Sequence, residues 1–149
     1  MDDESKEVYR KAIRYLALKR LSKYELQQKL LKQGFRTDKI ELVIQICLEK
    51  QFLDDESYQQ DFLLYQQRKG RSSKMIEQKM KEKFGSFVSV VSKTDVDAVS
   101  LDNLLKKKSY QKKISHPEER KKVILALIRK GFSLSLIKDK VPLAKQDCQ

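Results

Sequence analysis

The stretch that decides the fold is LSKYELQQKLLKQGF, residues 21–35. Ser22 and Glu25 stand three residues apart, which is the spacing of a capping box at the start of a helix. Gly34 follows at the position of a left-handed helix cap, and Phe35 is placed to fold back as the hydrophobic partner of that cap. The stretch therefore predicts one short helix with both of its ends defined, and Leu26, Leu30 and Leu31 as its inner face.

The landmarks of this helix return twice along the chain. About 50 residues later, Ser22, Leu26 and Leu30 correspond to Ser72, Ile76 and Met80. About 97 residues later, Leu30, Gly34, Phe35 and Ile40 correspond to Leu127, Gly131, Phe132 and Ile137. A period near 50 with three helices per unit indicates a helical array, in which each unit buries its apolar face against its neighbours. We predict an all-α fold of three tandem three-helix repeats forming an elongated, curved helical array.

The expected repeats span residues 1–53, 54–94 and 95–149, with a basic polar link near 106–117. The second repeat is expected to end in a short helix around Phe87 to Val91. In the third repeat, Ser115 and Glu118 have the spacing of a second capping box, with Pro117 in the first helical turn.

Composition limits the classes of function. Lys and Arg number 33 against 21 Asp and Glu, and the net charge of +12 favours an acidic partner such as nucleic acid or a nucleoprotein assembly. The first residues are acidic and contain no apolar signal segment, and no apolar run approaches a membrane span. We therefore expect a cytoplasmic, monomeric protein without a membrane partner, with Cys47 as a core thiol.

No catalytic or metal-binding pattern is present. The single histidine, His116, lies beside Pro117 at an expected helix start, and one His with two distant Cys cannot form a zinc site. The acidic run from Asp54 to Glu56 is explained by helix capping, because carboxylates accept hydrogen bonds from free N–H groups at a helix N-terminus. We expect a protein that is not an enzyme and that carries no cofactor or metal.

Basic clusters are the candidate binding residues. A single lysine is usually part of a solvated face, but arginine pairs bidentately with phosphates and carboxylates, so a cluster around a turn favours function. We predict partner binding by Arg68, Lys69, Arg71, Lys74, Lys79, Lys83, Lys106, Lys107, Lys108, Arg129 and Lys130. Tyr65 and Tyr110 lie near basic residues and can stack on bases, although tyrosines at helical spacing are usually core.

An ordered set of these motifs resembles the RecX family of regulatory proteins. The segment from Tyr15 to Leu26, with Lys29-Leu30 and Gly34-Phe35, resembles the family's opening repeat. Further matches in the same order are Phe52-Leu53-Asp54-Asp55, Tyr58 and Phe62, Arg68-Lys69-Gly70 and Ile76, and Gly131-Phe132-Ser133 and Ile137.

The resemblance implies three three-helix repeats, no catalytic site and binding to the recombinase RecA. It also implies that the protein lodges in the groove of the RecA–DNA filament and inhibits ATPase and strand exchange, which restrains recombination and the DNA-damage response. The residues themselves leave a second function open, namely a non-catalytic helical protein that binds DNA or RNA directly.

Overall fold

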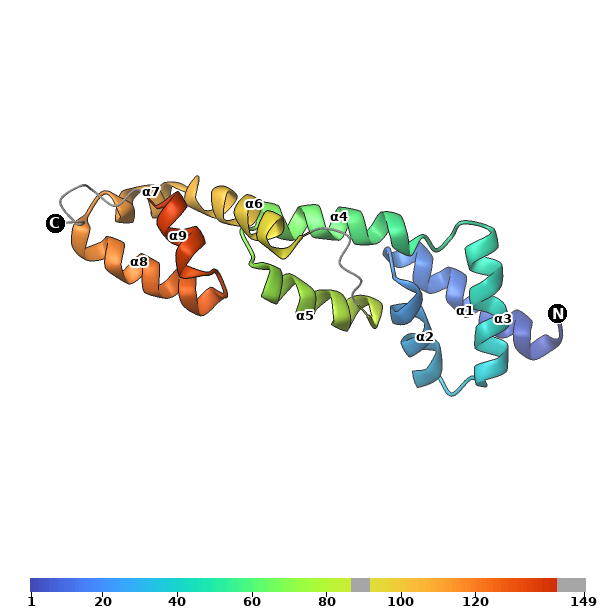
Figure 1. Ribbon diagram of the computed structural model, residues 1–149. Helices are drawn as coiled ribbons and strands as arrows, with labels where there is room; N and C mark the ends of the chain where they lie inside the picture. Colours follow the sequence, from blue (N-terminus) through green and yellow to red (C-terminus); the bar gives the residue numbers. More distant parts are fainter. Residues whose placement is uncertain (87–91, 142–149) are drawn as a thin grey trace. The chain divides into compact units, whose positions relative to one another are not determined.

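Helices alone form the regular structure of the described residues, 1–86 and 92–141, in the computed structural model (Figure 1). They are α1 (Asp3–Leu18), α2 (Lys23–Lys32), α3 (Thr37–Glu49), α4 (Asp55–Arg68), α5 (Ser73–Phe84), α6 (Lys93–Leu105), α7 (Lys108–Ile114), α8 (Pro117–Lys130) and α9 (Leu134–Lys140). The predicted all-α fold of tandem three-helix repeats is confirmed. The curvature expected of such an array stays a prediction.

The backbone groups into two compact units. Unit 1 contains Met1–Asp61 and the segment from Met80 to residue 86, and unit 2 contains Phe62–Lys79 and the described residues from 92 onward. Both α4 and α5 therefore contribute one part to each unit.

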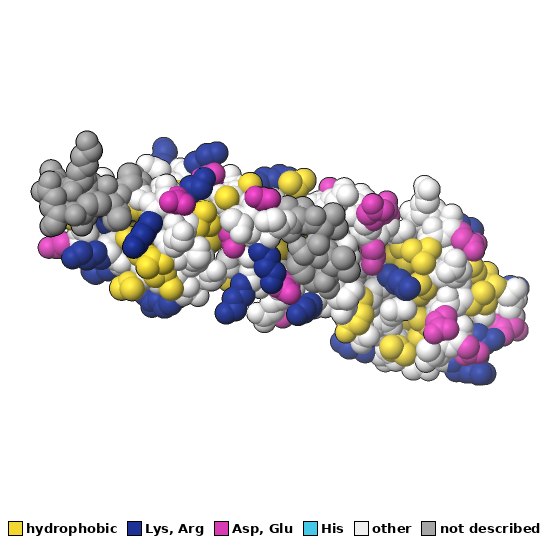
Figure 2. Space-filling view, viewed as in Figure 1, with side chains coloured by type: hydrophobic (Ala, Val, Ile, Leu, Met, Phe, Trp, Pro, Cys, Tyr) yellow, Lys and Arg dark blue, Asp and Glu magenta, His cyan; other side chains and the backbone are white. Residues whose placement is uncertain are grey.

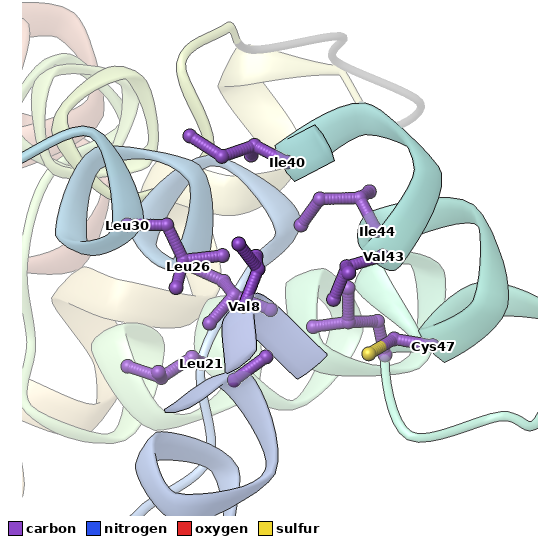
Figure 3. Packing of buried hydrophobic residues seen from close by; sticks show 10 residues of the cluster. Val8, Leu21, Leu26, Leu30, Ile40, Val43, Ile44 and Cys47 are labelled. Atoms are coloured by element: carbon purple, nitrogen blue, oxygen red, sulfur yellow. The ribbon is translucent and has the colours of Figure 1, made fainter. Parts of the chain in front are cut away.

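The core of unit 1 is formed by α1, α2 and α3. The side chains of Val8, Leu26, Leu30, Val43 and Cys47 are fully buried there, and Figure 3 shows them pointing toward one another. Helical spacing of 3 or 4 residues places these side chains on the inner stripe of each helix. The expectation of a core thiol at Cys47 is confirmed, and burial raises the pKa of this thiol. Leu31, expected on the inner face of α2, is exposed instead, so the buried stripe of that helix is narrower than predicted.

Unit 2 has its own core. Leu101 and Leu104 from α6, Leu127 from α8 and Ile137 from α9 are buried together. Tyr110 of α7 packs against this cluster, and Ile114 is buried within it.

The polar link predicted near 106–117 is wrong, because residues 108–114 form α7. Tyr110 and Ile114 are four residues apart and give this polar segment one apolar side, which is enough to hold a helix against a core. The buried side chain of Arg120 also holds the C-terminal end of α7, because its Nε donates to the Ile114 carbonyl at 3.0 Å. The expected boundary between residues 94 and 95 falls inside the first turn of α6, and the expected helix around Phe87 to Val91 lies outside the described residues.

The helix ends test the capping predictions. Ser22 and Glu25 form the predicted reciprocal box, and Gly34 and Gly131 have φ values of 85° and 109°. The second box is wrong: the Oγ of Ser115 donates to the Lys112 carbonyl at the end of α7. The residue that precedes α8 is His116, which makes no side-chain cap, and Pro117 opens the helix as predicted.

Candidate functional site

A serine that caps the second helix of one repeat is hydrogen-bonded to the end of the corresponding helix in the next repeat. In unit 1, Ser22 Oγ donates to the Lys83 carbonyl at 2.5 Å. In unit 2, Ser72 Oγ donates to the Lys130 carbonyl at 2.7 Å. We call these two places the Ser22 joint and the Ser72 joint. Each joins a helix N-terminus to a helix C-terminus through one buried hydroxyl.

A carboxylate reinforces each joint. Asp55 accepts a hydrogen bond from the Lys23 backbone N–H at 2.9 Å beside Ser22. Asp97 accepts one from the Ser73 backbone N–H at 2.6 Å and one from the Ser73 hydroxyl at 3.0 Å. The negative charge in both cases faces the positive end of a helix dipole, where it is stabilising.

The Ser72 joint brings two predicted basic clusters together. Arg68 ends α4, Lys69 follows it directly, and Lys74 lies in the first turn of α5. Arg129 and Lys130 arrive at the same joint as the last two residues of α8. A Cβ added to Gly131 would lie 3.4 Å from the Cβ of Lys74, so the two backbones meet closely. We call Arg68, Lys69, Lys74, Arg129 and Lys130 the basic surface.

The charges of the basic surface are not neutralised. All five side chains are exposed, and none forms an ion pair within the part of the chain that the structure describes. The nearby Asp97 is already bonded to Ser73. Because like charges held close together repel one another, such a surface gains most from an anionic partner.

The meeting of its cations at one joint, rather than the overall charge, distinguishes the basic surface. Figure 2 shows Lys and Arg side chains over much of one face of the molecule, interspersed with acidic and apolar side chains. The net charge of +12 alone therefore does not single out a site.

The lysines at the end of α6 adjoin the Gly70 turn. Asn103 Nδ2 donates to the Gln67 carbonyl at 3.0 Å. A Cβ on Gly70 would lie only 2.7 Å from the Cβ of Leu104, so this turn rests directly on α6. The exposed Lys106, Lys107 and Lys108 follow Leu104 within four residues, and none has an ion pair among the described residues.

Three of the predicted binding residues, Arg71, Lys79 and Lys83, are half-buried rather than exposed. Arg71 is half-buried, and its Nη1 donates to Oε1 of the buried Gln66, so its bond supports the Gly70 turn. Lys79 is half-buried on α5 in unit 2.

Lys83 belongs to the Ser22 joint. Its Nζ lies 3.3 Å from Oε2 of Glu25 and 5.2 Å from the centre of the Tyr58 ring. Burial alone would lower the pKa of Lys83, but hydrogen bonding to Tyr58 and the charge of Glu25 outweigh it, and the pKa is raised. The partner of Lys83 lies 58 residues earlier in the chain, so no local pattern marks this lysine as paired.

Sequence reasoning placed Ser22 and Ser72 at equivalent helix starts but missed their second role as donors to a distant carbonyl. No local sequence pattern marks this role, because the acceptor carbonyls lie 61 and 58 residues away. In the structure the two serines are buried, whereas Ser133, which caps only α9, is exposed.

Across the described ranges, no group of three or more His, Cys, Asp or Glu side chains is arranged to hold a metal ion. No helix in the same ranges has the length and apolar character of a membrane span.

Comparison with known proteins finds similarity to RecX regulatory proteins. The family model described as the first three-helix domain of RecX matches residues 9–46, which contain the capping box and Gly34. The chain is 35% identical over 72 residues to the regulatory protein RecX of Vibrio campbellii, covering 48% of this chain and 46% of that protein. It is 34% identical over 64 residues to the regulatory protein RecX of Chlorobium limicola, covering 42% and 40%. The chain therefore matches less than half the length of these curated relatives.

Solved structures extend the likeness to most of the fold. The crystal structure of RecX from Lactobacillus salivarius has a TM-score of 0.64 at 18% identity and covers 93% of this chain and 95% of that one. A second crystal structure of regulatory protein RecX has a TM-score of 0.67 at 19% identity, with 91% and 70% covered. The chain is therefore similar in sequence to the first three-helix domain of RecX and to two RecX regulatory proteins, and it shares its helical fold with two RecX crystal structures.

Proposed function

We propose that this chain binds the RecA–DNA filament through the basic surface and lowers the ATPase and strand-exchange activity of the recombinase. The observation that carries the proposal is the meeting of five exposed cations at one hydrogen-bonded joint, where none of them has an ion pair among the described residues. The chain would act as a cytoplasmic monomer and would need no catalytic group, cofactor or metal of its own.

A nucleoprotein filament fits this surface because its DNA carries a regular row of phosphates. Arg68 and Arg129 can each pair with a phosphate in a bidentate manner, and the three lysines add point charges around them. The Ser72–Lys130 bond holds the α5 and α8 ends in place before binding, which reduces the entropy lost when the cations are ordered on the phosphates. Lys106, Lys107 and Lys108 would extend the contact along the strand.

Direct binding to DNA or RNA is the second candidate function. The same unpaired cations favour it, because they would recognise phosphates whether or not a recombinase coats the strand. The two functions differ in what must be present: a regulator needs the filament, whereas a plain nucleic-acid-binding protein binds the bare strand equally well.

The test combines an ATPase assay with a pull-down. The chain at equimolar ratio should lower the DNA-dependent ATPase of RecA and should bind RecA–single-stranded DNA filaments more tightly than DNA alone. The variant Arg68→Glu/Arg129→Glu should lose most of the inhibition. Its matched control is Lys19→Glu/Lys32→Glu, which makes the same change in charge at exposed lysines of unit 1.

Unchanged ATPase and strand exchange with the wild-type chain would contradict the regulatory proposal. Equal capture by bare DNA and by filaments would favour the direct binder. Loss of inhibition in the control pair as well would show that only total charge matters and would remove the basic surface from the proposal.

A further inference from the structure

Tyr65 differs from the other tyrosines in its surroundings. Tyr9 and Tyr15 pack against the core of unit 1, and Tyr110 packs against the core of unit 2. Tyr58 packs edge-on against Phe84 with ring centroids 5.2 Å apart, and an added Cβ on Gly85 would lie 2.8 Å from the ring of Tyr24. Tyr65 has 49% of its surface exposed, and its one described ring contact is with Lys69, whose Nζ lies 5.5 Å from the ring centre.

The ring stands beside the basic surface. Tyr65, Arg68 and Lys69 are spaced by three and four residues at the end of α4, which places them on one side of the helix. The expectation that a tyrosine at this helical position is core is therefore wrong. The side chain is half exposed, Lys69 Nζ lies over its ring, and neither Arg68 nor Lys69 forms an ion pair among the described residues.

An exposed ring next to phosphate-binding cations has a chemical use. A strand that places a phosphate on Arg68 or Lys69 brings its nearest base close to the ring of Tyr65. Only an unpaired base offers a free face for stacking, because the bases of a duplex are paired and stacked on one another. Stacking on aromatic rings is also tolerant of sequence, since every base has a flat face.

We propose that Tyr65 is a stacking platform for an unpaired base and that it gives the basic surface a preference for single-stranded over double-stranded nucleic acid. The inference deepens the proposed function and rests on it for the phosphate contacts at Arg68 and Lys69. It names the form of nucleic acid that this surface selects.

Binding of bare oligonucleotides tests the preference without recombinase. Fluorescence anisotropy with a labelled single-stranded oligo-dT and with a duplex of equal length should show tighter binding to the single strand. Tyr65→Ala should weaken single-strand binding by about 5- to 100-fold, the range for loss of one stacked base, and should leave duplex binding within about twofold. Tyr65→Phe keeps the ring and should retain the preference. Leu64→Ala is the matched control, because Leu64 is the preceding residue and is 52% exposed.

A spectroscopic test reads stacking directly. The chain contains no tryptophan, so Tyr65→Trp introduces a unique fluorophore. Single-stranded DNA should quench its emission through base stacking, and duplex DNA should not. In the control Leu64→Trp, neither DNA form should quench the emission.

Equal single-strand affinity in wild type and Tyr65→Ala would overturn the inference, and so would an equal loss on both DNA forms. If bare strands show no dependence on Tyr65 but the chain still inhibits RecA, the proposed function stands and the inference fails. If the dependence on Tyr65 is present and the ATPase of RecA is unaffected, the inference stands and the filament proposal fails.

Discussion

The Ser22 and Ser72 joints share their hydrogen bonds and differ in their charges. In both, a buried serine hydroxyl caps one helix and donates to the last turn of another, and a carboxylate accepts the next backbone N–H. These shared bonds hold neighbouring repeats together. They do not by themselves give either joint a binding function.

The positions around the two joints show the difference. Counting from each serine and from each accepting carbonyl, Arg68, Lys74 and Arg129 of the Ser72 joint correspond to Leu18, Tyr24 and Glu82 of the Ser22 joint. Lys69 corresponds to Lys19, which is also an exposed lysine. Lys130 has no ion pair among the described residues and corresponds to Lys83, which is paired with Glu25.

At these equivalent positions the Ser22 joint therefore carries much less positive charge than the Ser72 joint. Like charges without partners do not stabilise a fold, so their concentration at one of two equivalent places is the feature on which the proposed binding rests. The comparison teaches that two repeats can share the same hydrogen bonds and still differ in the charge around them.

The largest expected effect on stability is at the Gly70 turn, which the Ser22 joint lacks. Gly70 has a φ of 78°, and a Cβ there would lie 2.7 Å from Leu104 Cβ and 3.1 Å from its Cα. Gly70→Ala should lower the free energy of unfolding by about 3 kcal/mol, because backbone strain adds to steric overlap. Hydrogen exchange should locate the loss in α6 rather than in α1 to α3. A variant that melts like the wild type would show that α6 moves aside without penalty.

The next largest effect is expected at the serine of the joint. Ser72→Ala removes a helix cap and the bond to the Lys130 carbonyl, and should lower the free energy of unfolding by about 2 kcal/mol. Ser133→Ala removes only a cap, from an exposed position, and should lower it by about 1 kcal/mol. Denaturant unfolding of the two variants measures the difference. Equal losses would mean that the bond between repeats contributes nothing.

Exchanging the residues at positions 74 and 24 should change filament affinity rather than stability. Lys74→Tyr copies the residue of the Ser22 joint and should weaken filament binding by about tenfold, since one attractive charge is lost at an anionic surface. The reciprocal Tyr24→Lys should leave filament affinity within about twofold. Titration of labelled filaments measures both. A loss of affinity in Tyr24→Lys equal to that in Lys74→Tyr would remove the functional distinction between the joints.

The smallest effect is expected at Gly34. Its φ is 85°, but no atom lies within 4 Å of an added Cβ. Gly34→Ala should therefore lower the free energy of unfolding by only about 1 kcal/mol, the penalty for a left-handed backbone at a residue with a Cβ. Thermal melting of Gly34→Ala and Gly70→Ala, measured in parallel, compares the two losses of stability. A larger loss at Gly34 than at Gly70 would contradict the packing of the Gly70 turn on α6.

Local signals in the sequence predicted the helical repeats well. The Ser22–Glu25 spacing and Gly34 define α2, because capping depends on residues within one turn of each helix end. The prediction failed where contacts are distant or weakly marked. Only two apolar residues, Tyr110 and Ile114, mark α7 in a segment rich in lysine.

The sequence predicted the residues of the candidate site, but it did not predict that they lie together. The clusters at Arg68–Lys74 and Arg129–Lys130 were both recognised, but their meeting depends on a hydrogen bond between residues 58 positions apart. Lys83 was assigned to partner binding, and its pairing with Glu25 across the chain could not be read from either local segment.

Salt dependence of filament binding tests the central claim most directly. The affinity of each variant for RecA–single-stranded DNA filaments is measured between about 50 and 200 mM salt, and the slope of log affinity against log salt is compared. The wild type should show a steep negative slope, and Arg68→Gln/Arg129→Gln should reduce its magnitude by roughly 1.4 to 1.8, the release expected from two phosphate contacts. The control Lys19→Gln/Lys32→Gln in unit 1 should keep the wild-type slope. An unchanged slope in the Arg68/Arg129 variant, or an equal reduction in the control, would contradict the assignment of binding to the Ser72 joint.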